Sequence, residues 1–70
     1  MDAYYVNMNL QDNGDNEVHK HGCEWMPGPQ YRIFLGYFNN CHEAVKEAKK
    51  TYPFTADGCR YCCPECDVRK

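Results

Sequence analysis

The stretch from Cys59 to Cys66 constrains the fold more than any other feature of this chain. It reads Cys-Arg-Tyr-Cys-Cys-Pro-Glu-Cys, so four of the six cysteines fall within one short segment. Two Cys-x2-Cys spacings occur in it, 59/62 and 63/66, and this spacing allows two thiolates of one tight turn to reach a single tetrahedral ion. Gly58 and Pro64 are turn-forming residues, typical of a metal knuckle. The sequence therefore predicts a metal site.

The length of the chain explains why such a site would be useful. Seventy residues form one domain, 1–70, at the small end of the range. In a domain of this size, burial alone stabilises the fold only marginally, and a metal or disulfides are often recruited. Apolar residues make up 43% of the sequence and include six tyrosines, three phenylalanines and one tryptophan. This composition supports one modest core and excludes a disordered chain.

Charge and hydropathy bear on partners and compartment. A formal net charge of −2 and a pI near 5.8 provide no electrostatic footprint for nucleic acid or an anionic membrane. The sequence contains no apolar run long enough for a membrane span and no secretory signal pattern. We therefore expect a cytoplasmic monomer with a macromolecular partner of unknown kind. A reducing compartment favours metal binding, although the even number of cysteines keeps a disulfide scaffold as an alternative.

Periodicity predicts an α+β fold with a small three-stranded antiparallel sheet, one helix and a Cys-rich C-terminal knuckle. Apolar and polar residues alternate over 4–11, which indicates a first strand. Turn-forming residues at 12–16 include Asn-Gly and predict a hairpin, with 17–21 as the returning strand. Residues 31–35 are apolar enough to form the central strand of the sheet.

The helix is expected to span 40–52. Asn40 is a suitable N-cap, and Glu43 occupies the capping-box position three residues later. An apolar stripe follows at helical spacing, and Pro53 ends the helix. Cys41 begins this stripe, which favours a buried and inert thiol over a reactive one.

His19 and Cys23 place two more potential ligands at the end of the hairpin. Their spacing could bring an imidazole and a thiolate to the same ion, where a strand gives way to a loop. An exposed histidine and a buried cysteine explain the same residues equally well. For His21, on the same face of the strand, the exposed interpretation is favoured. Trp25, in the loop that follows, is expected to cap the core.

The order of these features resembles the small metal-binding domain of Ada-type DNA repair proteins. It runs strand, His-x3-Cys, strand, helix and Cys-x2-Cys over 18–66, and the segment 38–44, Phe-Asn-Asn-Cys-His-Glu-Ala, is similar to the segment that opens the helix in those domains. The resemblance implies a related fold and bound zinc. In the repair domain a zinc-bound cysteine accepts a methyl group from DNA, and His19 stands at that position here. The resemblance therefore does not carry methyl transfer to this chain.

Similar zinc modules attached to bacterial nucleases also carry histidine at this position, and the chain looks like other small stand-alone bacterial proteins. These resemblances imply a zinc module without the repair activity.

The expected zinc ligands come from the hairpin exit and the C-terminal knuckle: His19, Cys23, Cys59 and Cys62. Cys66 or Cys63 could replace His19 or one of the pair, because four adjacent thiols offer more ligand sets than one ion needs. A closed site with four protein ligands has no open position for hydrolysis. We therefore expect a non-catalytic structural or interaction module.

Two alternatives stay open. One is a zinc-activated cysteine that accepts alkyl groups, with Cys63 or Cys66 as the spare nucleophile. The other is a dithiol redox protein that uses Cys62 and Cys63 or a Cys-x2-Cys pair, although the βαβ setting of thioredoxin-like proteins is absent from the sequence.

Overall fold

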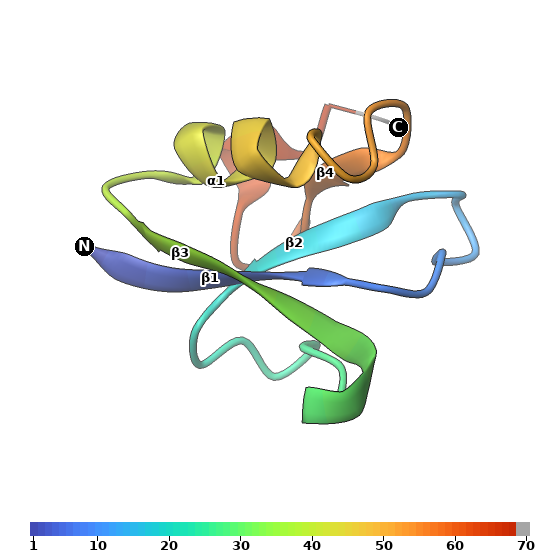
Figure 1. Cartoon of the computed structure of the whole chain (residues 1–70), viewed down its shortest axis with the longest axis horizontal. Coiled ribbons are helices and arrows are strands. Elements are labelled where there is room, and N and C mark those ends of the chain that lie inside the picture. Colours follow the sequence, from blue (N-terminus) through green and yellow to red (C-terminus); the bar gives the residue numbers. More distant parts are fainter. Residues whose placement is uncertain (69–70) are drawn as a thin grey trace.

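A computed structural model describes residues 1–68, in which a four-stranded sheet carries a helix on one face (Figure 1). The strands are β1 (Asp2–Asn7), β2 (Asn16–Lys20), β3 (Arg32–Phe38) and β4 (Ala56–Gly58), and the helix is α1 (Cys41–Ala48). Two 3-10 turns, η1 (Pro29–Tyr31) and η2 (Pro64–Cys66), complete the regular structure. The strand order is β3-β1-β2-β4.

The α+β class is confirmed, but the predicted sheet lacked one strand. β1 pairs antiparallel with β2 and β3, whereas β4 pairs parallel with β2. The short segment of β4, Ala-Asp-Gly, has the composition of a turn and no strand signal. It becomes a strand through long-range backbone bonds, because the N–H of Asn16 donates to Thr55 and the N–H of Cys59 donates to Val18. The sheet is therefore mixed.

The most apolar strand is not central. β3 forms an edge of the sheet, whereas β1 and β2 lie in the middle. The register of β3 against β1 shifts between Tyr4 and Tyr5, opposite Gly36, which has a φ of +131°. This is a β-bulge, and Gly36 adopts its backbone conformation without the strain that a side chain would add. The apolar residues of β3 are explained by partial burial and ring contacts, and they did not require a central position.

The helix begins as predicted and ends early. The Asn40 side chain accepts a hydrogen bond from the Glu43 N–H at 3.0 Å, which is the expected N-cap. The regular helix stops at Ala48 instead of continuing to 52. After it, the N–H groups of Lys50 and Thr51 bond to carbonyls only three residues back, so the last turn tightens before Pro53.

The core lies between α1 and the adjacent face of the sheet. Small side chains on the helix, including Ala44 and Ala48, let it approach the strands closely, and both are fully buried. Val6 and Val18 are buried beneath them. Because this core is so small, it stabilises the fold only modestly and leaves a role for further links.

One such link is a disulfide between Cys41 and Cys66, whose Cα atoms are 6.3 Å apart. Cys41 is buried as predicted, but the prediction of a free thiol there was wrong. The bond joins the first turn of α1 to η2, two segments that lie far apart in sequence. In the structure Cys66 therefore does not offer a thiolate to a metal, although the sequence made it a candidate ligand.

None of the helices within residues 1–68 combines the length and the apolar character needed to cross a membrane.

Candidate metal centre

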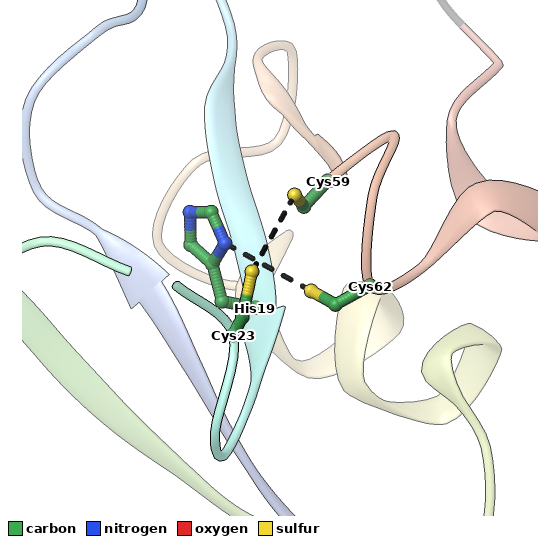
Figure 2. Close-up of side chains that lie close together, drawn as sticks. All are labelled: His19, Cys23, Cys59 and Cys62. Carbon is green, nitrogen blue, oxygen red and sulfur yellow. Dashed lines mark hydrogen bonds between the residues drawn. The ribbon is translucent and has the colours of Figure 1, made fainter. Parts of the chain in front are cut away.

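Four potential ligands converge beside β2 (Figure 2). One donor atom from each lies within 4.8 Å of every other: His19, Cys23, Cys59 and Cys62. These are the four residues of the expected set. The two alternatives are outside this group, since Cys66 is in the disulfide and Cys63, although next to Cys62, is not one of the four donors.

Local backbone structure brings the four together. His19 belongs to β2, and the chain reverses after it at Gly22, which has a φ of +92°. The Cys23 N–H closes this turn by donating to the Lys20 carbonyl at 3.1 Å. On the other side, the parallel pairing of β4 ends with the Cys59 N–H donating to Val18 at 3.0 Å. The pairing of β4 with β2 therefore places the knuckle directly against the hairpin exit.

The separations suit one tetrahedral ion. The sulfur atoms of Cys23 and Cys59 are 3.9 Å apart, and Cys62 Sγ lies 3.9 Å from Nδ1 of His19. Ligands at about 2.3 Å for sulfur and about 2.0 Å for nitrogen around a tetrahedral centre would be roughly 3.5–3.8 Å from one another. A disulfide would require about 2.05 Å between sulfurs. The arrangement thus fits a shared ion better than a covalent bond.

Backbone N–H groups point at two of the sulfur atoms. The Lys20 N–H donates to Cys62 Sγ at 3.3 Å, and the Tyr61 N–H donates to Cys59 Sγ at 3.4 Å. Such bonds favour the thiolate form of each cysteine, because they stabilise negative charge on sulfur. The end of β2 and the turn between the two knuckle cysteines therefore each supply one N–H group that supports a thiolate.

Burial sets the protonation of the site before a metal binds. It lowers the pKa of His19 to about 4, so the imidazole is neutral at pH 7 and ready to act as a ligand. It raises the pKa of Cys59 to about 12 and also raises that of Cys23. The pKa of Cys62 is raised first by its hydrogen bond with Cys63 and then by burial. Three neutral thiols therefore face the imidazole, and a divalent cation would displace their protons.

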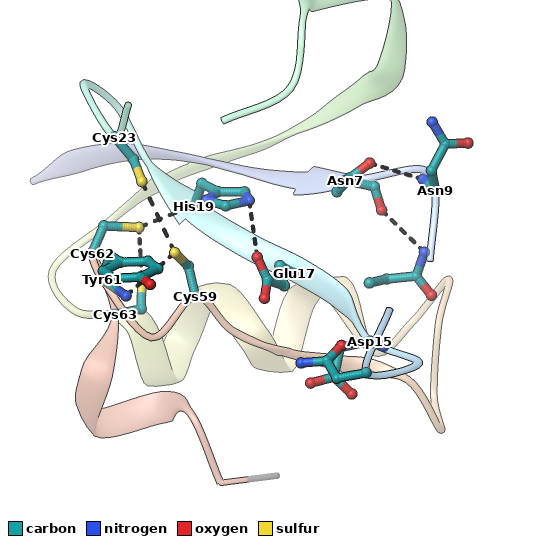
Figure 3. A network of polar contacts seen from close by, with 12 residues as sticks. Asn7, Asn9, Asp15, Glu17, His19, Cys23, Cys59, Tyr61, Cys62 and Cys63 are labelled. Atoms are coloured by element: carbon teal, nitrogen blue, oxygen red, sulfur yellow. Dashed lines mark hydrogen bonds and ion pairs between the residues drawn. The ribbon is translucent and has the colours of Figure 1, made fainter. Parts of the chain in front are cut away.

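Glu17 lies behind the imidazole and was not among the predicted residues. Nε2 of His19 is 3.6 Å from Oε1 of Glu17, just beyond hydrogen-bond distance, and this buried nitrogen has no hydrogen-bond partner among the described residues (Figure 3). Burial raises the pKa of Glu17, and the charges of nearby carboxylates raise it further. Glu17 and His19 are two residues apart on β2, so their side chains point to the same face of the strand. Strand periodicity alone could therefore have identified the pair.

Cys63 lies next to the centre without belonging to it. Its sulfur is 3.7 Å from that of Cys62, and its side chain is fully buried in the core cluster. The hydrogen bond from the Cys62 thiol lowers the pKa of Cys63. The Cys63 sulfur therefore affects the pKa of Cys62 through their hydrogen bond, while the Cys63 side chain packs in the core as a small apolar residue.

Two aromatic rings stack on each other in the segments that also carry the ligand candidates. Trp25 and Tyr61 stack with their centroids 5.1 Å apart, and the exposed fractions of these residues are 57% and 63%. The expectation that Trp25 caps the core was wrong, because its partner is a ring of the knuckle and not the core. His21 is exposed, as expected. Each ring belongs to a segment that supplies metal-ligand candidates, because Trp25 follows Cys23 and Tyr61 lies between Cys59 and Cys62.

Comparison with protein-family models, curated proteins and solved structures found no match for this chain. The function is therefore inferred from the site. Its three sulfur atoms and one imidazole nitrogen form a group able to hold a metal ion.

Proposed function

We propose that this protein is a small zinc-binding structural or interaction module without catalytic activity. The observation that carries the proposal is the convergence of four donor atoms, within 4.8 Å of one another, from segments that are distant in sequence. The ligands are His19, Cys23, Cys59 and Cys62.

The donor set favours zinc. Three thiolates and one imidazole are a common ligand set of structural zinc sites, whereas magnesium and calcium prefer oxygen ligands. Zinc also has no redox chemistry of its own and accepts tetrahedral geometry readily. Nδ1 of His19 would ligate the ion, because this nitrogen faces Cys62 while Nε2 faces Glu17.

A structural role follows from the place of the site in the fold. The four ligands would fill a tetrahedral coordination sphere, which leaves no open position for water or substrate. They also join β2 and the loop after it to the C-terminal knuckle, across a domain with a small core. Metal binding would then supply much of the folding free energy, as in other small metal domains.

The Ada-type alternative has less support. Its spare nucleophile was to be Cys63 or Cys66, but Cys63 is fully buried and Cys66 is bonded to Cys41. A DNA substrate would also need a basic surface, and the chain has a net charge of −2. We propose that the isolated domain is a monomer whose partner is not nucleic acid.

Metal analysis tests the proposal. Protein purified with a mild reductant and without added chelator is expected to contain one zinc per chain by elemental analysis. Native mass spectrometry should show the metal on folded protein, with loss of folded charge states when a strong chelator is added. Folded, metal-free protein with Cys23, Cys59 and Cys62 reduced as the sole species would contradict the proposal, and a different metal at one equivalent would correct the choice of zinc.

A further inference from the structure

The disulfide lies beside a pocket that is separate from the metal centre. The pocket has a volume of about 330 Å³ and is lined by α1 on one side and by the segment around η2 on the other. Cys66 lines it, whereas Cys41 lies in the first turn of α1. Lys46 and Lys49 line the helix side, and Glu65 lines the opposite side.

His42 accompanies the disulfide. One of its ring nitrogens lies within 4.8 Å of the sulfur atoms of both Cys41 and Cys66, and the residue is exposed and also lines the pocket. A disulfide that only links two elements has no need of a solvent-facing imidazole at this distance. A disulfide that opens and closes does, because a thiolate must be stabilised or protonated when the bond breaks.

We propose that the Cys41–Cys66 disulfide is a thiol–disulfide exchange site for a small thiol that carries a carboxylate group. The proposal does not depend on the zinc site, since the two sites share no residue.

In the first step, the thiolate of the small thiol attacks Cys66 Sγ, the sulfur of the residue that lines the pocket. A sulfur–sulfur bond forms between the small thiol and Cys66, the Cys41–Cys66 bond breaks, and Cys41 leaves as a thiolate. A second small thiolate then attacks the sulfur of the first. This step releases the small-molecule disulfide and leaves Cys66 as a thiolate. Two electrons pass from two small thiols to the protein, and their two protons are taken up by Cys41 and Cys66.

The position of Cys41 makes it the better leaving group. It occupies the first turn of an eight-residue helix, where the unpaired N–H groups and the helix dipole stabilise a thiolate. A lower leaving-group pKa speeds exchange. His42 in the same turn can donate a proton to the departing sulfur, because its ring nitrogen is close to both cysteines. Attack at the pocket and departure at the helix are thus assigned to different sulfurs.

The two lysines select a thiol with a carboxylate. Lys46 and Lys49 are exposed on the helix side of the pocket, and neither forms an ion pair within the part of the chain that the structure describes. Across the pocket, the carboxylate of Asp57 accepts hydrogen bonds from the Val68 N–H at 3.1 and 3.3 Å. An anionic group of a bound thiol would therefore turn toward the lysines and away from the side that holds Asp57 and Glu65.

The experiment compares two thiols that differ in charge and little else, 3-mercaptopropionate and 3-mercaptopropionamide. The zinc-loaded, oxidised protein is mixed with each thiol, and the reaction is stopped with an alkylating agent and followed by intact mass. Each rate is divided by the rate for the same protein in denaturant, which removes differences in intrinsic reactivity. At low ionic strength the normalised rate should be about tenfold higher for the carboxylate, the lower end of the range by which local charge raises association rates.

Variants of the pocket residues test which side chains cause the preference for the carboxylate thiol. Lys46→Gln combined with Lys49→Gln should abolish the preference for the carboxylate, and the rate with the amide, whose thiolate carries the only negative charge, should fall less than the rate with the carboxylate. Lys50→Gln is the control for a helix lysine outside the pocket, to be compared with each single lysine variant, because Lys50 pairs with Glu47 and does not line the pocket. His42→Gln should slow both thiols. Peptide mapping should find the trapped small thiol on Cys66 and the alkylating agent on Cys41.

Several results would overturn the proposal: a mixed disulfide on Cys41, equal normalised rates for the two thiols, or a rate that does not depend on thiol concentration. The last would mean that the bond is reduced only after the domain unfolds. Free thiols at both positions in protein purified without reductant would exclude the site outright. Zinc content measured before and after the reaction separates these outcomes from failure of the metal centre.

Discussion

The two ends of the Cys59–Cys66 segment differ in chemistry although they lie close together in sequence. Cys59 and Cys62 face β2, where their sulfurs lie 3.9 Å from Cys23 and His19 respectively. Cys66 instead is bonded to Cys41 at the start of α1. The same residue type is thus a candidate metal ligand at one end and half of a disulfide at the other. The element that each cysteine faces decides its role.

A sharp reversal of the chain separates the two ends. Gly58 lies against the end of the same segment, because a Cβ added at Gly58 would be 2.6 Å from the Cβ of Cys66 and 2.8 Å from the Cys63 carbonyl oxygen. The Cys63 N–H donates to the Cys59 carbonyl at 2.8 Å, and the Cys66 N–H donates to that of Cys63 at 2.9 Å. The segment therefore winds into two successive turns, and these aim its thiols in different directions.

Adjacent cysteines provide the largest test of this difference. Cys62→Ala removes one of the four proposed ligands, and we expect it to lower metal affinity by more than the ~10- to 100-fold typical of losing an outer partner of a ligand. The variant should be largely unfolded without excess zinc. Cys63→Ala, whose sulfur lies 3.7 Å from that of Cys62, should keep the metal and lose only about 1 kcal/mol of stability. Zinc titration and circular dichroism measure both, and equal loss of metal in the two variants would contradict the ligand assignment.

The second largest effect is expected from acidification, which should weaken metal binding at one end of the Cys59–Cys66 segment and leave the disulfide at the other end intact. Burial or hydrogen bonding raises the pKa of each proposed thiol ligand, so the metal must displace about three protons at neutral pH. Affinity should therefore fall by roughly three orders of magnitude between pH 7 and pH 6. The disulfide takes up no proton over this range and should remain intact. Competition titrations with a chelator of known pH dependence measure how zinc affinity changes with pH. A change of about tenfold or less between pH 7 and pH 6 would mean that fewer than three thiols lose a proton when the metal binds.

Removal of the disulfide should cost less than loss of the metal. Replacing both Cys41 and Cys66 with alanine opens a loop with a sequence separation of 25. The chain-entropy estimate for a loop of this size is about 3.5 kcal/mol. Denaturant unfolding of the zinc-loaded protein gives the loss of stability, and elemental analysis should still find one zinc per chain. If the double variant loses its metal, the two ends of the segment are not independent.

Much of the candidate metal centre could be predicted from the sequence, because a short spacing between two ligand residues fixes how they lie on one turn. Cys-x2-Cys and His-x3-Cys each place two donors on one turn, and the structure brings the two pairs together. The disulfide and β4 depend on contacts between segments far apart in the chain, which spacing does not encode. Cys41 had a sufficient local explanation as part of a helix stripe. Cys66 had one as part of a knuckle, so nothing in the sequence linked the two.

The chain reversal itself can be tested at Gly58. Gly58→Ala should cost about 2–3 kcal/mol, because the new methyl group would clash with backbone atoms of Cys63 and Cys66 that cannot move independently. Gly22→Ala is the matched control. Its backbone has a φ of +92°, but a Cβ there would meet nothing within 4 Å. It should cost about 1 kcal/mol from backbone strain alone. Thermal unfolding that ranks the two in the opposite order would show that the reversal at Gly58 tolerates a side chain.

The smallest expected effect concerns the residue behind the imidazole. A metal-bound histidine usually donates its second N–H to a carboxylate, which fixes the ring and strengthens it as a ligand. Oε1 of Glu17 is 3.6 Å from Nε2 of His19, so a shift of a few tenths of an ångström would complete such a bond when Nδ1 binds zinc. Glu17→Gln keeps the shape and removes the charge, and we expect zinc affinity to fall about tenfold.

Glu47→Gln is the control for the loss of one negative charge, because Glu47 pairs with Lys50 on the helix surface. Both variants leave the disulfide untouched, so any difference between them reports on the metal end of the segment alone. If Glu17→Gln and Glu47→Gln bind zinc equally well, the carboxylate contributes only background charge. His19 would then be oriented by β2 without help from its neighbour.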